Sequence, residues 1–145
     1  MITASYPLAT PIRSRRILRV TLWVVQVLLA AAFGAAGFSK LSQPIAALAG
    51  QMSWTAVVPT WVVRLNGAAE LLGALGLLLP SLTRVKPRLT ALAALGLVTV
   101  MLLAAVFHVS RGEFAMLPPV LVLGALAAFV AWGRGSSAPI ASRSH

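Results

Sequence analysis

Four apolar runs follow one another along the chain and are separated by short polar segments. They cover about residues 20–38, 61–79, 89–109 and 116–132. A helix needs about 20 apolar residues to cross the hydrocarbon core of a bilayer. Only helices and closed barrels satisfy their backbone hydrogen bonds in lipid, and runs of this length are too continuous for barrel strands. The pattern therefore predicts an all-α fold, a bundle of four transmembrane helices.

A shorter mixed stretch, residues 45–58, lies between the first two predicted helices and is bounded by Pro44 and Pro59. Because it is too short to span a bilayer, it predicts an interfacial or re-entrant segment on the outer side, with a plain apolar loop as the alternative. The second helix is predicted to stop at Pro80. The predicted organisation is a tail over residues 1–16, a membrane domain over 17–133 and a second tail over 134–145.

The first apolar run follows a basic segment and contains small residues near Gly34, so a signal peptide is the alternative to a transmembrane helix. The apolar core of a signal peptide has about 7–15 residues, and this run is longer. We therefore expect a retained membrane anchor.

Composition supports a membrane protein. Hydrophobic residues make up 59% of the chain, charged residues only 10%, and the mean hydropathy is +0.93. Soluble domains carry about 25% charged residues because they must cover a large surface with polar groups. The composition excludes an ordinary soluble globule, a disordered chain and a disulfide scaffold. The chain has no cysteine, so a dithiol redox centre and a thiolate metal site are also excluded.

Twelve Lys and Arg residues against two acidic residues give a net charge of +10. The basic residues cluster between the apolar runs and no nucleic-acid-binding motif accompanies them, so we expect no nucleic-acid partner. The side of the membrane with more Lys and Arg is the cytoplasmic side. The counts predict a multi-pass protein of the plasma (inner) membrane with both termini in the cytoplasm. Nine basic residues fall on that side (Arg13, Arg15, Arg16, Arg19, Arg84, Lys86, Arg88, Arg134, Arg143) and three on the other (Lys40, Arg64, Arg111).

Polar residues within the apolar runs gather toward the outer side. At 1.5 Å per residue, Glu70 lies about 15 Å from Pro80 and so close to the bilayer midplane. The same count places Lys40 and His108 about 30 Å from the inner face, at the outer edge. We therefore predict one polar site at the outer mouth, formed by Lys40, Arg64, Asn66, Glu70, His108 and Arg111.

Helical phase brings these residues to the interior of the bundle. On the second predicted helix, the polar residues share one side with small residues, and leucines occupy the opposite side, toward lipid. The first helix presents Gln26, Ala30, Phe33 and Gly37 on one side, with Lys40 at its rim. The third presents Leu97, Met101, Ala104 and His108 on one side.

Glu70 is the strongest single indication of a site, because an unpaired carboxylate near the midplane costs several kcal/mol. Either it is neutral, or a cation from the mouth pairs with it. Arg64 and Lys40 are both candidate partners, although Lys40 reaches Glu70 only if its helix lies deeper than the residue count places it. A catalytic or binding role and a purely structural one both remain open.

The other mouth residues have simpler alternatives. Lys40 can extend its ammonium group to the interface, and His108 can be an ordinary interfacial residue. Arg111 and Glu113 can form a local turn pair. One histidine within the apolar runs supplies neither a bis-histidine haem nor a metal site of two histidines and a carboxylate. We therefore expect no metal and no resident cofactor.

Three segments together resemble the DoxX-like family of small four-helix membrane proteins. They are Gly37-Phe38-Ser39-Lys40-Leu41, then Gly67-Ala68-Ala69-Glu70-Leu71 with Gly73 and Gly76 before Pro80, and Met101-Leu102-Leu103-Ala104 leading to His108. The resemblance covers about residues 16–134. It implies the fold and a polar site but no reaction. The family takes its name from a subunit of an archaeal terminal quinol oxidase, and other members look like accessory or assembly factors.

Three hypotheses about function follow. The first is a non-enzymatic accessory or assembly protein that binds a membrane protein partner, or a second copy of itself, in a redox-linked complex. The second is a quinone-linked oxidoreductase subunit, in which quinone would be the cofactor. The third is a proton-coupled carrier of a small solute with Glu70 as its proton site. The sequence lacks a complete catalytic set, which favours the first.

Overall fold

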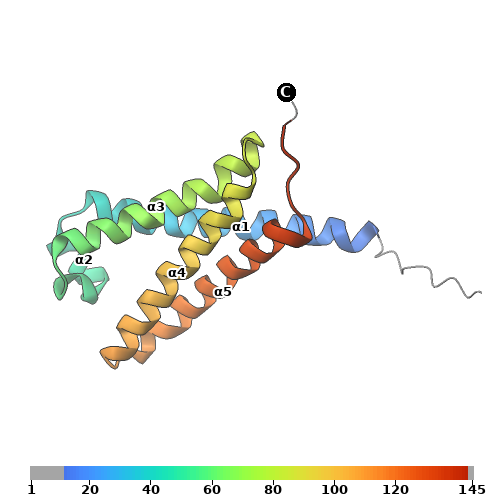
Figure 1. Cartoon of the computed structure of the whole chain (residues 1–145). Coiled ribbons are helices and arrows are strands. Elements are labelled where there is room, and N and C mark those ends of the chain that lie inside the picture. The colour runs from blue at the N-terminus through green and yellow to red at the C-terminus, as the bar shows by residue number, and fades with distance from the viewer. Residues whose placement is uncertain (1–11, 144–145) are drawn as a thin grey trace, which may run out of the picture.

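The computed structural model describes residues 12–143, which are mostly helical (Figure 1). Four long helices are apolar enough to cross a membrane, which confirms the predicted four-helix all-α fold. They are α1 (Ile12–Ser42), α3 (Thr60–Thr83), α4 (Arg88–Ser110) and α5 (Leu117–Trp132). Shorter elements connect or extend them: α2 (Ile45–Gln51), the 3₁₀ turns η1 (Ser53–Ala56) and η2 (Phe114–Met116), and the π-helical turn η3 (Gly133–Ser137).

The four long helices form two pairs. Helix α1 packs along α3, α4 packs along α5, and α3 joins the two pairs through its contact with α4. Figure 1 shows the pairs diverging toward the end that carries α2. We call this end the pocket end. The opposite end contains the α3–α4 turn and η3, and it is called the basic end below.

Small residues set the distance between helices. A Cβ atom added at Gly37 of α1 would lie 2.6 Å from the Gly67 carbonyl oxygen of α3, so the two backbones are in direct contact. A Cβ added at Gly73 would likewise lie 2.5 Å from the Leu97 side chain of α4. Membrane helices associate through such small-residue contacts, because lipid removes most of the hydrophobic drive between them.

The predicted interior faces are confirmed. Gln26, Phe33 and Lys40 of α1 are buried, as are Leu97 and His108 of α4. The leucines predicted to face lipid on α3 are exposed on the outside of the bundle, namely Leu72, Leu75 and Leu79.

The prediction that the second helix stops at Pro80 is wrong, because α3 continues through Pro80 to Thr83. Proline removes one backbone donor, but neighbouring helices and side chains make this tolerable in membrane helices. Ser81, one residue later, is buried and its hydroxyl lies 2.8 Å from the Thr90 hydroxyl of α4. The helix ends at Arg84, whose left-handed conformation (φ 59°) reverses the chain toward α4.

Residues 45–58 form ordered helical turns, α2 and η1, rather than a plain loop. Leu48 and Thr55 are buried, so this segment packs against the bundle. The long helices extend into both predicted tails, since α1 starts at Ile12 and η3 continues α5 to Ser137. The following segment returns to the α3–α4 turn, where the Arg143 backbone N–H donates to the Arg84 carbonyl at 3.1 Å. The remaining tail residues, 1–11 and 144–145, lie outside the described part of the chain.

Candidate functional site

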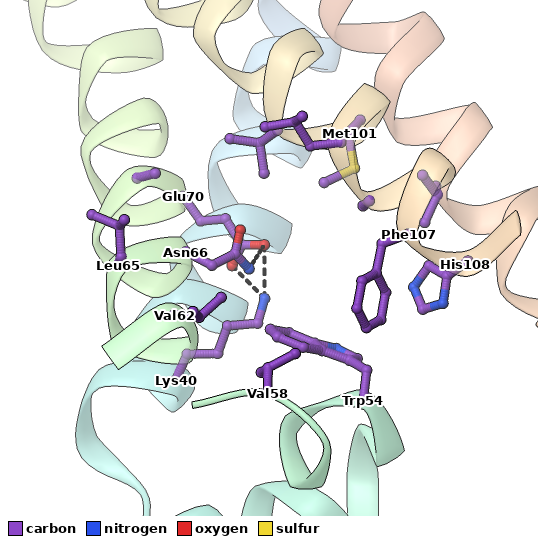
Figure 2. A pocket seen from close by; sticks show the side chains of 15 residues that line it. Lys40, Trp54, Val58, Val62, Leu65, Asn66, Glu70, Met101, Phe107 and His108 are labelled. Carbon is purple, nitrogen blue, oxygen red and sulfur yellow. Dashed lines mark hydrogen bonds and ion pairs between the residues drawn. The ribbon is translucent and has the colours of Figure 1, made fainter. Parts of the chain in front are cut away.

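A buried ion pair joins α1 and α3 at the pocket end. The Lys40 Nζ lies 2.6 and 2.7 Å from the two carboxylate oxygens of Glu70, and the residues are 5% and 3% exposed. Asn66, one turn before Glu70, donates from Nδ2 to the same carboxylate at 3.3 Å. Figure 2 shows the three side chains converging. Of the two candidate cations, the structure therefore selects Lys40 as the partner of Glu70.

The glycine contact explains how Lys40 reaches Glu70. A Cβ at Gly67 would lie 2.7 Å from the Lys40 Cβ, so α3 is closely packed against α1 beside this lysine. This contact places Lys40 at the level of Gly67, and Glu70 is three residues further along α3, so the Cα atoms of Lys40 and Glu70 differ in depth by roughly 4.5 Å. Side chains on a helix lean toward its N-terminus. Because α1 and α3 run in opposite directions, Lys40 leans toward the basic end, Glu70 leans toward the pocket end, and the gap closes.

Arg64 has a different role from the one predicted, since it is bonded to backbone carbonyls. Its guanidinium donates to the Lys40 carbonyl and, at 2.9 Å, to the Gln43 carbonyl. Both carbonyls lie at the C-terminal end of α1, where helical carbonyls lack intrahelical donors and carry partial negative charge. Arg64 thus caps α1 and fixes the backbone from which Lys40 projects.

A cavity of about 480 Å³ lies beside the ion pair, between α3 and α4. Its polar lining consists of Lys40, Glu70, Asn66 and His108, which all belong to the predicted site. The walls are apolar and include Val62, Leu65, Met101 and Leu103. Arg64 and Arg111, the other two predicted residues, do not line the cavity.

Aromatic side chains cover the cavity at the pocket end. Trp54, supplied by η1, has its ring 5.7 Å from the Lys40 Nζ, in cation–π geometry. It also meets Phe107 of α4 edge to face, with ring centroids 6.4 Å apart. Figure 2 shows Trp54 beneath the Lys40 ammonium, with Phe107 and His108 on the α4 side. Trp54 was not among the predicted site residues, because nothing local in the sequence indicated that residues 45–58 fold back over the helices.

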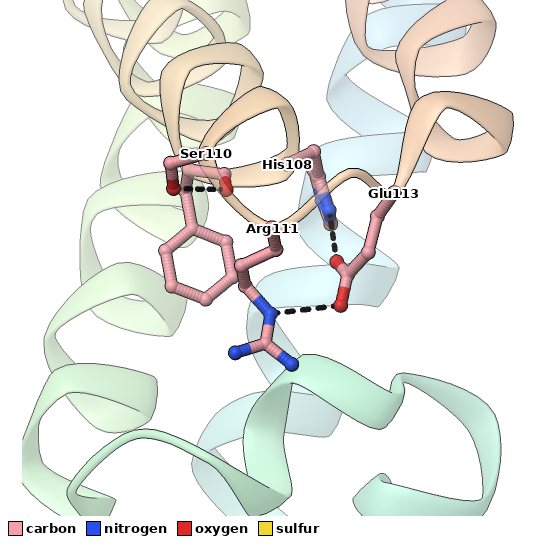
Figure 3. Close-up of polar contacts among 5 residues, drawn as sticks. His108, Ser110, Arg111 and Glu113 are labelled. Carbon is pink, nitrogen blue, oxygen red and sulfur yellow. Dashed lines mark hydrogen bonds and ion pairs between the residues drawn. The ribbon is translucent and has the colours of Figure 1, made fainter.

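His108 belongs to a second polar group at the edge of the cavity. Its Nδ1 lies 2.7 Å from one Glu113 oxygen, and the Arg111 Nε donates to the other oxygen at 2.8 Å (Figure 3). Hydrogen bonds from Arg111 and then from His108 hold the pKa of Glu113 below its usual value. The predicted turn pair of Arg111 and Glu113 is thus confirmed, with His108 as an added partner.

The turn after α4 places Glu113 where it can reach His108. Gly112 adopts φ +69°, and its N–H donates to the Val109 carbonyl at 3.0 Å. The Glu113 N–H donates to the His108 carbonyl at 2.9 Å. These two bonds define a Schellman motif, which needs a residue such as glycine in the left-handed conformation. The same turn therefore ends α4 and positions the carboxylate.

A further buried polar cluster, at the basic end, was not predicted. Gln26 of α1 donates to the Leu77 carbonyl at 2.7 Å and to the Ser81 hydroxyl at 3.2 Å. Its side-chain oxygen accepts a hydrogen bond from Arg134 of η3. Arg134 was predicted to lie in the C-terminal tail, but its side chain is buried, at 5% exposed.

Within residues 12–143, no three His, Cys, Asp or Glu side chains are grouped so that they could hold a metal ion. A family model described as the DoxX-like family matches residues 24–130. Searches of curated proteins and of solved structures found no match. The match spans the ion pair, the cavity and all of α3 and α4.

Proposed function

This chain belongs to the DoxX-like family, and from that premise we propose that it is a non-enzymatic accessory protein of a redox-linked membrane complex. Its own contribution is to hold a lipid-soluble molecule of the quinone class in the cavity beside Lys40 and Glu70. The observation that carries this proposal is the cavity itself, with apolar walls and a small number of convergent polar groups. Ligand sites of small molecules have this composition and volumes of about 300–1,000 Å³.

The charge of the cavity suits a neutral ligand. Lys40 and Glu70 neutralise each other at 2.6 Å, so the lining offers hydrogen bonds without a net charge from this pair. An ammonium group has three donors, of which Glu70 takes two, and Asn66 adds an amide. A ring with carbonyl or hydroxyl oxygens would take these bonds, and Trp54 and Phe107 offer aromatic surfaces for the ring itself.

The position of the walls favours entry from lipid. Leu65 of α3 and Leu103 of α4 both line the cavity and are 62% and 65% exposed on the outside of the bundle. Lipid covers such residues in a membrane. A molecule dissolved in the bilayer would therefore pass between α3 and α4 without crossing the aqueous phase.

Fluorescence of Trp54 tests the proposal directly. In a variant with Trp23, Trp61 and Trp132 replaced by phenylalanine, Trp54 is the only tryptophan. We expect a short-chain quinone added to this variant in lipid nanodiscs to quench its emission saturably, with Lys40→Ala weakening the effect. A matched variant that retains only Trp132, at the other end of α5, should show weak quenching that does not saturate. Equal, non-saturable quenching of both variants would contradict quinone binding.

The accessory role is tested separately. The full chain should co-purify from native membranes with a stoichiometric protein partner or a second copy, together with extractable quinone. If neither is recovered and vesicles show a proton flux that is lost in Glu70→Gln, the carrier hypothesis replaces this proposal.

A further inference from the structure

The basic end contains a buried cation for which the chain supplies no carboxylate side chain. Arg134 is 5% exposed. The sequence contains two acidic residues, and both lie at the pocket end, in contact with other cations. A buried charge that lacks a counterion is strongly unfavourable. Arg134 therefore requires an anion that comes from outside the side chains of this chain.

The contacts of Arg134 leave part of its guanidinium available. Its Nε donates to the Gln26 side chain and its Nη1 to the Ala138 carbonyl at 3.4 Å, and both acceptors are neutral. Its Nη2 is buried, and no acceptor within residues 12–143 meets it. A guanidinium presents its donors as a planar fork, which matches the oxygens of a phosphate group.

Two residues of α1 extend this feature toward the end of the bundle. The Trp23 ring lies 5.2 Å from the Arg134 guanidinium carbon, and the exposed Arg19 carries a second positive charge one turn before Trp23 on α1. Arg19, Trp23 and Gln26 are spaced four and three residues apart, so they share one face of α1. Two cations that repel each other beside an aromatic ring are stabilised together when an anion lies between them.

We propose that Arg134 and Arg19 form a binding site for an anionic phosphate group at the basic end of the bundle. The group is either the headgroup of an anionic phospholipid or a soluble phosphate. The site lies near the end of the apolar segment Phe114–Ser137, the depth at which headgroups meet the protein. Because Nη2 is buried, phosphate reaches it only when groups around Arg134 move, and the Trp23 ring is one of its neighbours. Trp23 therefore reports on binding. The site is independent of the cavity and of the function proposed for it.

The test uses the full chain in neutral detergent with Trp54, Trp61 and Trp132 replaced by phenylalanine, so that Trp23 alone is observed. It is titrated with short-chain phosphatidylglycerol, with short-chain phosphatidylcholine and with inorganic phosphate. We expect a saturable change in Trp23 emission with phosphatidylglycerol and at least tenfold weaker apparent binding of phosphatidylcholine. Arg19→Gln, at an exposed position, should weaken phosphatidylglycerol binding about tenfold. Lys86→Gln, which removes an exposed cation from the α3–α4 turn, should leave it within about twofold.

Each result decides between stated outcomes. Binding of phosphatidylglycerol but not of inorganic phosphate assigns the site to a lipid headgroup, and equally strong binding of inorganic phosphate assigns it to a soluble anion. Arg134→Gln should abolish the response, and because that variant can also impair folding, the exposed Arg19→Gln variant is the deciding one. Unchanged affinity in Arg19→Gln overturns the two-arginine site. No response in any titration overturns the proposal altogether. The counterion of Arg134 would then be a carboxylate of a partner protein.

Discussion

Lys40 at the pocket end and Arg134 at the basic end are equally buried, at 5% exposed each, yet their surroundings differ. Lys40 contacts a carboxylate of the same chain at 2.6 Å, whereas Arg134 is bonded to a neutral amide and a backbone carbonyl. When both partners of a buried ion pair belong to one chain, the sequence alone supplies the counterion. When the chain supplies no acidic partner for a buried cation, the counterion must come from the surroundings. We therefore expect the pocket end to be stable in any neutral lipid and the basic end to respond to anions.

Glu70→Gln is the largest expected perturbation, because it gives the pocket end the same defect as the basic end. The substitution preserves shape but leaves the Lys40 charge buried without a counterion. Removing one partner of a buried pair costs about 3–5 kcal/mol. The measurement is the free energy of unfolding, from thermal or denaturant unfolding of the full chain in nanodiscs of neutral lipid.

The double variant Lys40→Met/Glu70→Gln is the control for this prediction. It removes both charges, and replacing a buried pair by uncharged groups is often close to neutral. Most of the lost stability should therefore return. Anionic lipid should leave the Glu70→Gln loss unchanged. A Glu70→Gln protein as stable as the wild type would show that the pair is not ionised.

Gly67→Ala is the second perturbation and tests whether the glycine contact sets the ion pair. The added Cβ would lie 2.7 Å from the Lys40 Cβ and 3.0 Å from the Gly37 carbonyl oxygen. Since neither the Lys40 Cβ nor the Gly37 carbonyl oxygen can move without the α1 backbone, α1 and α3 must separate, at a cost of about 1–3 kcal/mol. Gly96→Ala is the matched control, because a Cβ at Gly96 meets nothing within 4 Å. It should be neutral or stabilising by up to about 1 kcal/mol, as expected for alanine in a helix. Similar losses in both variants would contradict the packing argument.

Much of the architecture could be predicted from the sequence because it depends on local quantities. Run length gives the four helices, and helical phase gives their interior faces, including the side of α4 that carries His108. Charge and depth together gave the two alternatives for Glu70, a neutral acid or an ion pair with a mouth cation. These inferences need no knowledge of how one helix is placed against another.

The choice between Lys40 and Arg64 could not be made in that way. Counting residues gives the depth of a Cα atom, but contact depends on the register of α1 against α3 and on the direction in which each side chain leans. The burial of Arg134 is also a tertiary effect, since it follows from a π-helical turn that carries the end of α5 back against Gln26. Composition alone assigns such a residue to a polar tail.

Arg64→Gln is the third perturbation and separates the capping cation from the paired one. It should lose the bonds to the Lys40 and Gln43 carbonyls at the end of α1 while leaving the Lys40–Glu70 pair intact. Arg64 is only partly buried, so water can replace part of the loss, and we expect a cost of about 1 kcal/mol. Unfolding experiments on Arg64→Gln and Glu70→Gln side by side measure the difference. A loss as large as that of Glu70→Gln would mean that Arg64 stabilises the carboxylate after all.

Glu113→Gln is the smallest perturbation, and it concerns the acid at the edge of the cavity. Arg111 and His108 lower the pKa of Glu113 from its usual 4.5. A carboxylate whose pKa is lower in the folded state stabilises the fold above its unfolded pKa, and this contribution disappears as the pH falls through the folded value. Wild type should therefore lose a small increment of stability on acidification below about pH 4.5 that Glu113→Gln lacks. Because the group is accessible to water and salt, we expect the difference at neutral pH to be at most about 2 °C in Tm and to shrink at high ionic strength. Melting curves of both proteins across pH 3–7 in neutral detergent measure it. A Glu113→Gln variant with the same acid-dependent increment as wild type would assign that increment to Glu70, and the pocket end would then depend on pH through its buried pair.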